Sequence, residues 1–93
     1  MTLLRHNPAR DKSEAAIVEA LRAVGWRVWS VSGSGLPDLL ILRRGVLKML
    51  ECKSKGGRLT TTQVKFHDDV RDERIDSVHI VYTIDEIREL GLL

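Results

Sequence analysis

Residues 37–54 read PDLLILRRGVLKMLECKS, two short apolar runs separated by a basic turn. Both runs are shorter than a typical helix, so the pattern predicts two β-strands joined by a tight turn. If Arg44 and Gly45 are the central turn residues, counting outward along both strands places Asp38 directly opposite Glu51. A three-residue turn would shift this pairing by one position. The stretch therefore predicts a β-hairpin that carries an acidic residue on each strand at its open end.

Three ionisable side chains are expected to converge at that open end. Strand side chains alternate between faces, so Glu51 and Lys53 point to one side and Cys52 to the other. Two facing carboxylates repel each other, and neighbouring leucines raise the cost by excluding water. A hard divalent ion such as Mg²⁺ would relieve the repulsion, and a nearby ammonium would stabilise negative charge on a phosphodiester under attack. In the alternative interpretation, Glu51 and Lys53 form an ordinary solvated pair and Asp38 only begins a strand. The apolar residues around all three argue against that interpretation.

Glu14 falls on the apolar stripe of a helix predicted over residues 13–25. The stripe consists of Ile17, Val18, Leu21 and Val24, with Ser13 as a plausible N-cap and Gly25 as the stop. Glu14 precedes Ile17 by three positions and Leu21 by seven, which places it on the inward face. An acid in the first turn also complements the helix dipole. Glu14 is therefore either a site residue or a dipole partner.

Gln63 repeats this pattern on a second predicted helix. That helix begins after Thr60 or Thr61, either of which can cap it, and runs through Val70 towards Arg74. Gln63 lies three positions before Phe66 and seven before Val70, so a polar group again falls on an apolar face. A buried glutamine needs hydrogen-bond partners. A water or phosphate in the active site and a backbone carbonyl of a neighbouring strand are both suitable.

The remaining segments predict the scaffold. Residues 26–31 and 78–82 have strand character, and residues 84–90 form a closing helix. The expected order is α-β-β-β-α-β-α, a single α/β domain over residues 1–93 with a small mixed sheet flanked by helices. Residues 1–11 are expected to form a loosely ordered N-terminal arm.

The net charge of the 93-residue chain is +2, but the charge is distributed unevenly. Residues 43–65 contain seven Lys or Arg and one acid, while residues 66–93 contain eight acids and three Arg. A basic block around paired acids suits a polyanion such as DNA, although a solvated hairpin tip gives the same pattern. The candidate DNA-binding residues are Ser34, Arg43, Arg44, Lys55, Arg58 and Lys65.

Several functional classes have little support. The single cysteine, Cys52, excludes an internal disulfide and is expected to pack behind its strand rather than act as a catalytic thiol. His6, His67 and His79 lack metal-ligand spacing. Residues 32–35 form a glycine-rich segment without the spacing of a P-loop or dinucleotide fingerprint, so they are expected to form a flexible rim, with no nucleotide cofactor. No stretch predicts a membrane span or a secretory signal, which favours a cytoplasmic protein.

Pro37-Asp38 followed by Glu51-Cys52-Lys53 resembles the PD-(D/E)XK nuclease signature, with Glu51 thirteen positions after Asp38. The wider pattern resembles the VRR-NUC branch of that superfamily, from about Glu14 to the C-terminus. It comprises Glu14 in a first helix, Gly33-Ser34-Gly35-Leu36 before the first acid, and Gly56-Gly57-Arg58-Leu59-Thr60 leading to Gln63.

This resemblance implies a PD-(D/E)XK nuclease-like core and a role for each site residue. Asp38 and Glu51 would ligate Mg²⁺ or Mn²⁺, with the backbone carbonyl of Cys52 and the carboxylate of Glu14 as further ligands. Lys53 would assist catalysis, and Gln63 would complete the site.

Stand-alone members of this branch act on four-way DNA junctions as homodimers, whereas members fused to larger proteins trim flaps. We therefore expect a metal-dependent DNA endonuclease of phage or bacterial type, a homodimeric four-way (Holliday) junction resolvase. The alternatives are a flap or other structure-specific nuclease, and a non-catalytic DNA-binding module on the same fold. The joint presence of Asp38, Glu51 and Lys53 argues against the non-catalytic module. Restriction-type cutting at a defined sequence would need base-reading elements that so short a chain does not offer.

Overall fold

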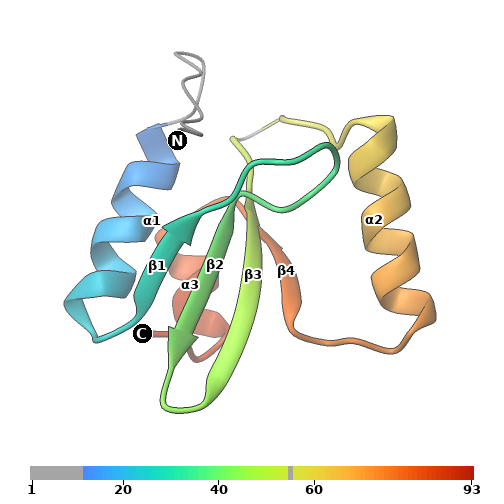
Figure 1. Ribbon diagram of the computed structural model, residues 1–93. Helices are drawn as coiled ribbons and strands as arrows, with labels where there is room; N and C mark the ends of the chain where they lie inside the picture. The colour runs from blue at the N-terminus through green and yellow to red at the C-terminus, as the bar shows by residue number, and fades with distance from the viewer. Residues whose placement is uncertain (1–11, 55) are drawn as a thin grey trace.

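The computed structural model describes residues 12–54 and 56–93 and has the predicted α/β architecture (Figure 1). The predicted N-terminal arm, residues 1–11, and Lys55 lie outside the described residues. The elements are α1 (Lys12–Ala23), β1 (Arg27–Ser30), β2 (Leu39–Arg43), β3 (Val46–Cys52), α2 (Thr61–Asp72), β4 (Val78–Val81) and α3 (Ile84–Glu89). The predicted order is confirmed. No helix in the described part of the chain is long and apolar enough to cross a membrane.

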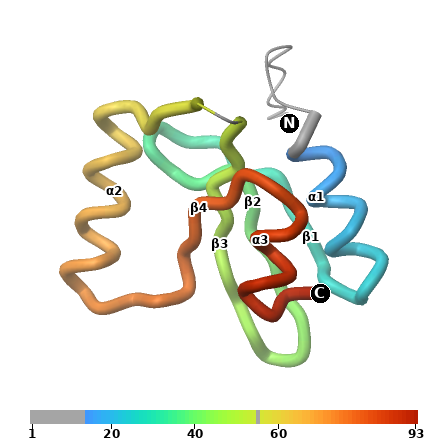
Figure 2. Tube along the Cα trace, turned by 180° about the vertical axis from the view of Figure 1, so that it is seen from behind, coloured from blue at the N-terminus to red at the C-terminus, as the bar shows by residue number. Residues whose placement is uncertain are grey.

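The four strands form one mixed sheet in the order β1-β2-β3-β4. The pairs β1–β2 and β2–β3 are antiparallel, whereas β3–β4 is parallel because α2 connects the two strands. Helices α1 and α3 lie together on one side of the sheet. Helix α2 stands apart beyond β4, as the views from opposite sides both show (Figures 1 and 2).

The β2–β3 hairpin has the predicted register. Arg43 pairs with Val46 and Leu39 pairs with Leu50, the last pair of the ladder, and Asp38 and Glu51 are the next residues outward along the chain. The two central turn residues have positive φ angles, 51° at Arg44 and 81° at Gly45. This is the type I′ geometry, whose twist matches that of the two flanking strands. The two-residue turn excludes the shifted pairing.

The N-terminus of α1 differs from the prediction. The helix begins at Lys12, so Ser13 lies in the first turn and is not the N-cap. The predicted first helical residue, Glu14, is two positions from the observed one, within the range by which helix ends vary. The predicted stop is confirmed, because Gly25 has a φ of 97° and the Trp26 amide donates to the Leu21 carbonyl. Such a left-handed residue ends a helix at little cost when it is glycine.

The hydrophobic core lies between the sheet and the pair α1–α3. Its buried members are Ile17, Leu21, Trp26, Val28, Leu39, Ile41, Leu50, Val81, Ile87 and Leu92. Strand alternation sends the intervening residues to the opposite face. On that open face Trp29 is 47% exposed, Leu47 55% and Ile80 37%. In the described structure one face of the sheet is therefore packed and the other is largely uncovered.

Candidate active site

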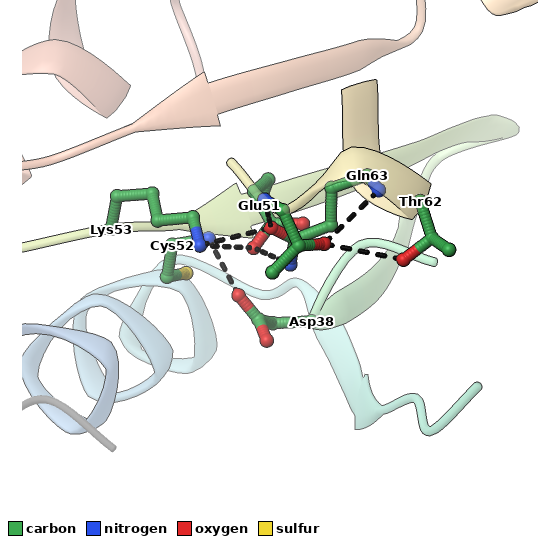
Figure 3. A network of polar contacts seen from close by, with 7 residues as sticks. Asp38, Glu51, Cys52, Lys53, Thr62 and Gln63 are labelled. Carbon is green, nitrogen blue, oxygen red and sulfur yellow. Dashed lines mark hydrogen bonds and ion pairs between the residues drawn. The ribbon is translucent and has the colours of Figure 1, made fainter. Parts of the chain in front are cut away.

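The predicted acids lie at the open end of the hairpin, where β2 begins and β3 ends. Asp38 is 7% exposed and Glu51 is 1% exposed, so both carboxyl groups are withdrawn from solvent. The Cys52 amide donates a hydrogen bond to Asp38 Oδ2 at 2.8 Å, which joins the two strands just beyond their last pair (Figure 3). Burial of carboxylates is costly unless hydrogen bonds or cations compensate. The open end of the hairpin is therefore a polar site within an otherwise apolar scaffold.

On the α1 side of β3, three groups able to ligate a metal meet. The carboxylates of Glu14 and Asp38 and the Cys52 thiol all lie within 4.8 Å of one another. They come from α1, from the residue before β2, and from the last residue of β3. The structure therefore brings Glu14 to the site. Cys52 packs against the core, as predicted, and its thiol also lies beside the acids. The pattern contained that signal, because strand alternation places Cys52 on the side of the sheet that α1 covers.

On the α2 side of β3, Gln63 connects Glu51 and Lys53. Its Nε2 donates to Glu51 Oε2 at 3.2 Å, and its Oε1 accepts from Lys53 Nζ at 3.1 Å (Figure 3). The Lys53 ammonium lies 3.9 Å from Glu51 Oε2. Among the described residues, the partners of the Gln63 side chain are thus other side chains and the Thr60 amide rather than a backbone carbonyl of the neighbouring strand. Gln63 connects the Glu51 carboxylate to the Lys53 ammonium.

Gln63 reaches this position because the first turn of α2 is tightly constrained. Thr60 caps the helix, and its amide donates to Gln63 Oε1 at 2.8 Å in a capping box. The helix start also packs against the glycine-rich segment 32–35, because a Cβ at Gly35 would lie 2.6 Å from the Thr62 carbonyl oxygen. Gly35 therefore has a packing role that the sequence did not indicate. The glycine permits close backbone contact with α2 rather than free motion.

One turn beyond Gln63, His67 lies near the same site. Burial lowers the pKa of His67 below 6.5, and the charge of Lys53 acts in the same direction while Asp68 opposes it. The neutral form of the imidazole is therefore favoured at neutral pH. Sequence reasoning excluded His67 as a zinc ligand but missed its closeness to Lys53, which has no signal in local spacing.

The candidate DNA-binding residues fall into separate regions. The turn with Arg43 and Arg44 lies at the opposite end of the hairpin from the acids (Figure 1). Arg43 stacks over Trp26 at 4.5 Å and donates to the Val24 carbonyl at 3.0 Å. Ser34 and Arg58 are exposed in the two loops beside the site.

Lys65 is exposed on α2 and pairs with Asp69 at 2.6 Å, which raises its pKa. Among the candidate DNA-binding residues that the structure describes, Ser34 and Arg58 therefore lie in the loops next to the acids, whereas the others lie in the hairpin turn and on α2.

The donor set suits a divalent cation. Carboxylates are the preferred ligands of Mg²⁺ and Mn²⁺, and such ions keep several waters while they bind one or two protein carboxylates. Asp38 and Glu51 flank the end of β3, and Glu14 lies within 4.8 Å of the first of them.

Comparison with known proteins agrees with this geometry. A sequence profile of the VRR-NUC domain matches residues 5–81. A solved structure described as a VRR_NUC domain shares the fold with a TM-score of 0.73 and 27% sequence identity, over 86% of this chain and 90% of that chain. No match was found among curated proteins. The chain belongs to the VRR-NUC family and is a domain of the nuclease type.

Proposed function

We propose that this protein is a Mg²⁺- or Mn²⁺-dependent DNA endonuclease that hydrolyses phosphodiester bonds in branched DNA. The observation that supports this most strongly is the Gln63 bridge. It holds Glu51 and Lys53 together beside the cluster of Glu14, Asp38 and Cys52. Hydrolysis of a phosphodiester needs acids that hold a cation, a base or ammonium beside it, and a fixed geometry between them.

Each residue has a role in this proposal. Asp38 and Glu51 hold the ion, with the Cys52 carbonyl and the Glu14 carboxylate as further ligands. Bound there, the ion would lower the pKa of a water molecule and screen the charge of the phosphate. Lys53 orients the attacking water and stabilises the negative charge that develops on the phosphate oxygens. Gln63 keeps the Lys53 ammonium and the Glu51 carboxylate at their working separation.

The substrate is proposed to be a four-way junction that a homodimer cuts on two strands. A site of this kind cuts one strand, so paired cuts in a symmetric junction call for two sites related by symmetry. The basic block at residues 43–65 would contact phosphates and supply affinity independent of base sequence. In this arrangement Ser34 and Arg58, in the loops beside the acids, contact the strand being cut. Arg43, Arg44 and Lys65 contact more distant phosphates.

The test is cleavage of a labelled four-way junction by wild type and by Lys53→Ala, with Mg²⁺, with Mn²⁺ and with a chelator. We expect wild type to cut only with metal, and Lys53→Ala to bind the junction but cut it at least about 100-fold more slowly. Lys48→Ala is the matched control, because Lys48 lies on β3, the strand that Lys53 directly follows, with its ammonium beside His79.

Three results would redirect the proposal. If neither protein cuts while both bind DNA, the chain is a non-catalytic DNA-binding module. If wild type cuts flaps or linear ends in preference to junctions, it is a flap or structure-specific nuclease. If Lys53→Ala cuts as fast as wild type, the role of the ammonium is wrong.

A further inference from the structure

The side chain of Cys52 has no role in the function proposed above, which uses only its backbone carbonyl. The thiol nevertheless lies in a cluster with the carboxylates of Glu14 and Asp38, and the three donor atoms are all within 4.8 Å of one another. The three residues come from α1, from the position before β2 and from the last position of β3. The tertiary structure therefore gathers a mixed set of sulfur and oxygen donors from three separate segments.

The backbone of β3 fixes two of these donors relative to each other. The Cys52 amide donates to Asp38 Oδ2 at 2.8 Å, and Cys52 pairs with Val81 in the parallel ladder. Asp38 is 7% exposed, and Cys52 is partly buried against the core. Side chains that are already held in place lose little conformational entropy when they bind a ligand, so this arrangement favours binding.

Strand alternation gives the thiol different neighbours from those of Glu51. The Glu51 carboxylate points towards α2, where Gln63 Nε2 donates to it, whereas the Cys52 thiol points towards Glu14 on α1. An ion bound to the thiol would therefore lie on the α1 side of β3, away from the Gln63 bridge.

A thiol beside two carboxylates changes which cation the cluster prefers. Mg²⁺ binds oxygen ligands, whereas a soft thiolate favours Zn²⁺ and related ions such as Co²⁺ and Cd²⁺. Zinc–sulfur bonds of about 2.3 Å and zinc–oxygen bonds of about 2.1 Å place the ligand atoms of a tetrahedral ion about 3.6 Å apart. Donor atoms that already lie within 4.8 Å of one another reach that geometry with small side-chain rotations.

We propose that Glu14, Asp38 and the thiol of Cys52 form a binding site for a sulfur-preferring divalent cation of the zinc type. The Cys52 sulfur releases its proton to solvent and binds as the thiolate. Because Asp38 and Glu14 are also the proposed ligands of Mg²⁺ or Mn²⁺, an ion bound to the thiol takes these ligands from the catalytic ion and stops cleavage. The inhibition rests on the nuclease function proposed above, whereas the binding of the ion does not.

The first test uses Co²⁺ as an optical probe for the zinc site. A thiolate bound to Co²⁺ gives a charge-transfer absorption band in the near ultraviolet, which carboxylate and imidazole ligands do not give. Cys52 is the single cysteine of the chain, so in the untagged protein the band reports this residue alone. We expect wild type without DNA to give a band that saturates with Co²⁺ and that added Zn²⁺ abolishes by displacement. A phosphine reductant keeps the thiol reduced without adding a competing thiol.

Zinc affinity is then measured by competition with a zinc-binding dye. Cys52→Ser, Cys52→Ala and Glu14→Gln should each raise the dissociation constant for Zn²⁺ at least about tenfold. Glu19→Gln is the matched control, because Glu19 is exposed on the same helix and lies outside the cluster. Glu51→Gln should keep the cobalt band, because Glu51 lies on the α2 side of β3. Circular dichroism checks that each variant is folded.

Inhibition is measured as cleavage of the four-way junction in Mg²⁺ over a zinc titration, with the rate of each protein divided by its own rate in Mg²⁺ alone. We expect Cys52→Ser to need at least about tenfold more Zn²⁺ than wild type for half-inhibition.

The outcomes separate the zinc site from the nuclease function. A wild type without the cobalt band, or equal zinc affinities of wild type and Cys52→Ser, would overturn the site. Equal sensitivity of their cleavage to Zn²⁺ would overturn the inhibition. A cobalt band in a wild type that cuts no DNA with Mg²⁺ or Mn²⁺ supports the site and removes the nuclease function instead.

Discussion

The two faces of the sheet differ in almost every physical respect. On the face covered by α1 and α3, Ile17, Leu21 and Leu50 are fully buried and form the core. The opposite face exposes Trp29 and Leu47, and the helix beyond β4 has no buried residue. The catalytic candidates lie where the two regions meet, at the end of β3. The covered face therefore supplies most of the stability, while the open side supplies Gln63 and leaves room for a nucleic acid or a partner.

The largest expected effect is on DNA cleavage, and it comes from one substitution on the open side of the sheet. Glu51→Gln removes the carboxylate that Gln63 and Lys53 contact, but it keeps the shape of a side chain that is 1% exposed. We expect junction cleavage to fall at least about 100-fold while junction binding is retained. Gel-based cleavage and fluorescence anisotropy measure the two properties. Glu19→Gln, on the exposed side of α1, is the control and should cut as wild type does. An active Glu51→Gln protein would mean that this acid holds no ion.

The second prediction separates the two faces on one strand. Leu50→Ala should lower the free energy of unfolding by about 2–5 kcal/mol, because it leaves a cavity in the core. Leu47→Ala, on the same strand but 55% exposed, should lower it by less than about 1 kcal/mol. Urea denaturation followed by circular dichroism measures both. Equal losses would show that the open face is buried in solution.

The third prediction separates the two roles of Gln63. Thr60→Ala removes the cap and should cost about 1 kcal/mol of stability with little change in cleavage rate. Gln63→Ala removes part of the same capping box and also the bridge to Glu51 and Lys53. We expect a similar loss of stability with cleavage slower by about tenfold or more. If both variants cut equally fast, the bridge has no part in catalysis.

The smallest expected effect is a dependence of stability on pH. Burial lowers the pKa values of His67 and His79 below 6.5; the charges of Lys53 and Lys48 act in the same direction, and nearby acids oppose them. The unfolded chain therefore binds more protons than the folded chain just below that pH, so stability rises with pH through this window. The contribution of the two neutral histidines to stability is fully present above pH 6.5 and is lost as the pH falls through their lowered pKa values.

Thermal unfolding between about pH 7.5 and about pH 5.5 tests this dependence. The melting temperature should be lower at the acidic end, and His79→Gln should reduce the difference between the two ends. A melting temperature that rises towards acid would contradict the direction of both shifts.

Much of the fold was accessible from the pattern of residues. The element order, the two-residue turn and the hairpin register from Arg43–Val46 to Leu39–Leu50 all follow from periodicity and turn chemistry, and all are confirmed. The Ser13 cap was wrong because helix α1 already includes Lys12, and helix ends differ from pattern-based expectation by one or two residues. The segment around Gly35 was expected to be mobile because local sequence does not reveal which backbone packs against a glycine.

Part of the candidate site could likewise be predicted from the sequence, and part required the folded structure. Alternation along a strand and periodicity along a helix are local properties, so the sequence alone established which face Glu14, Gln63 and Lys53 occupy. Contacts among α1, β3 and α2 depend on how those elements pack in space. Folding was therefore needed to show that the Cys52 thiol joins Glu14 and Asp38. It was also needed to show that no residue of α2, the helix carrying Gln63, is buried in the described chain.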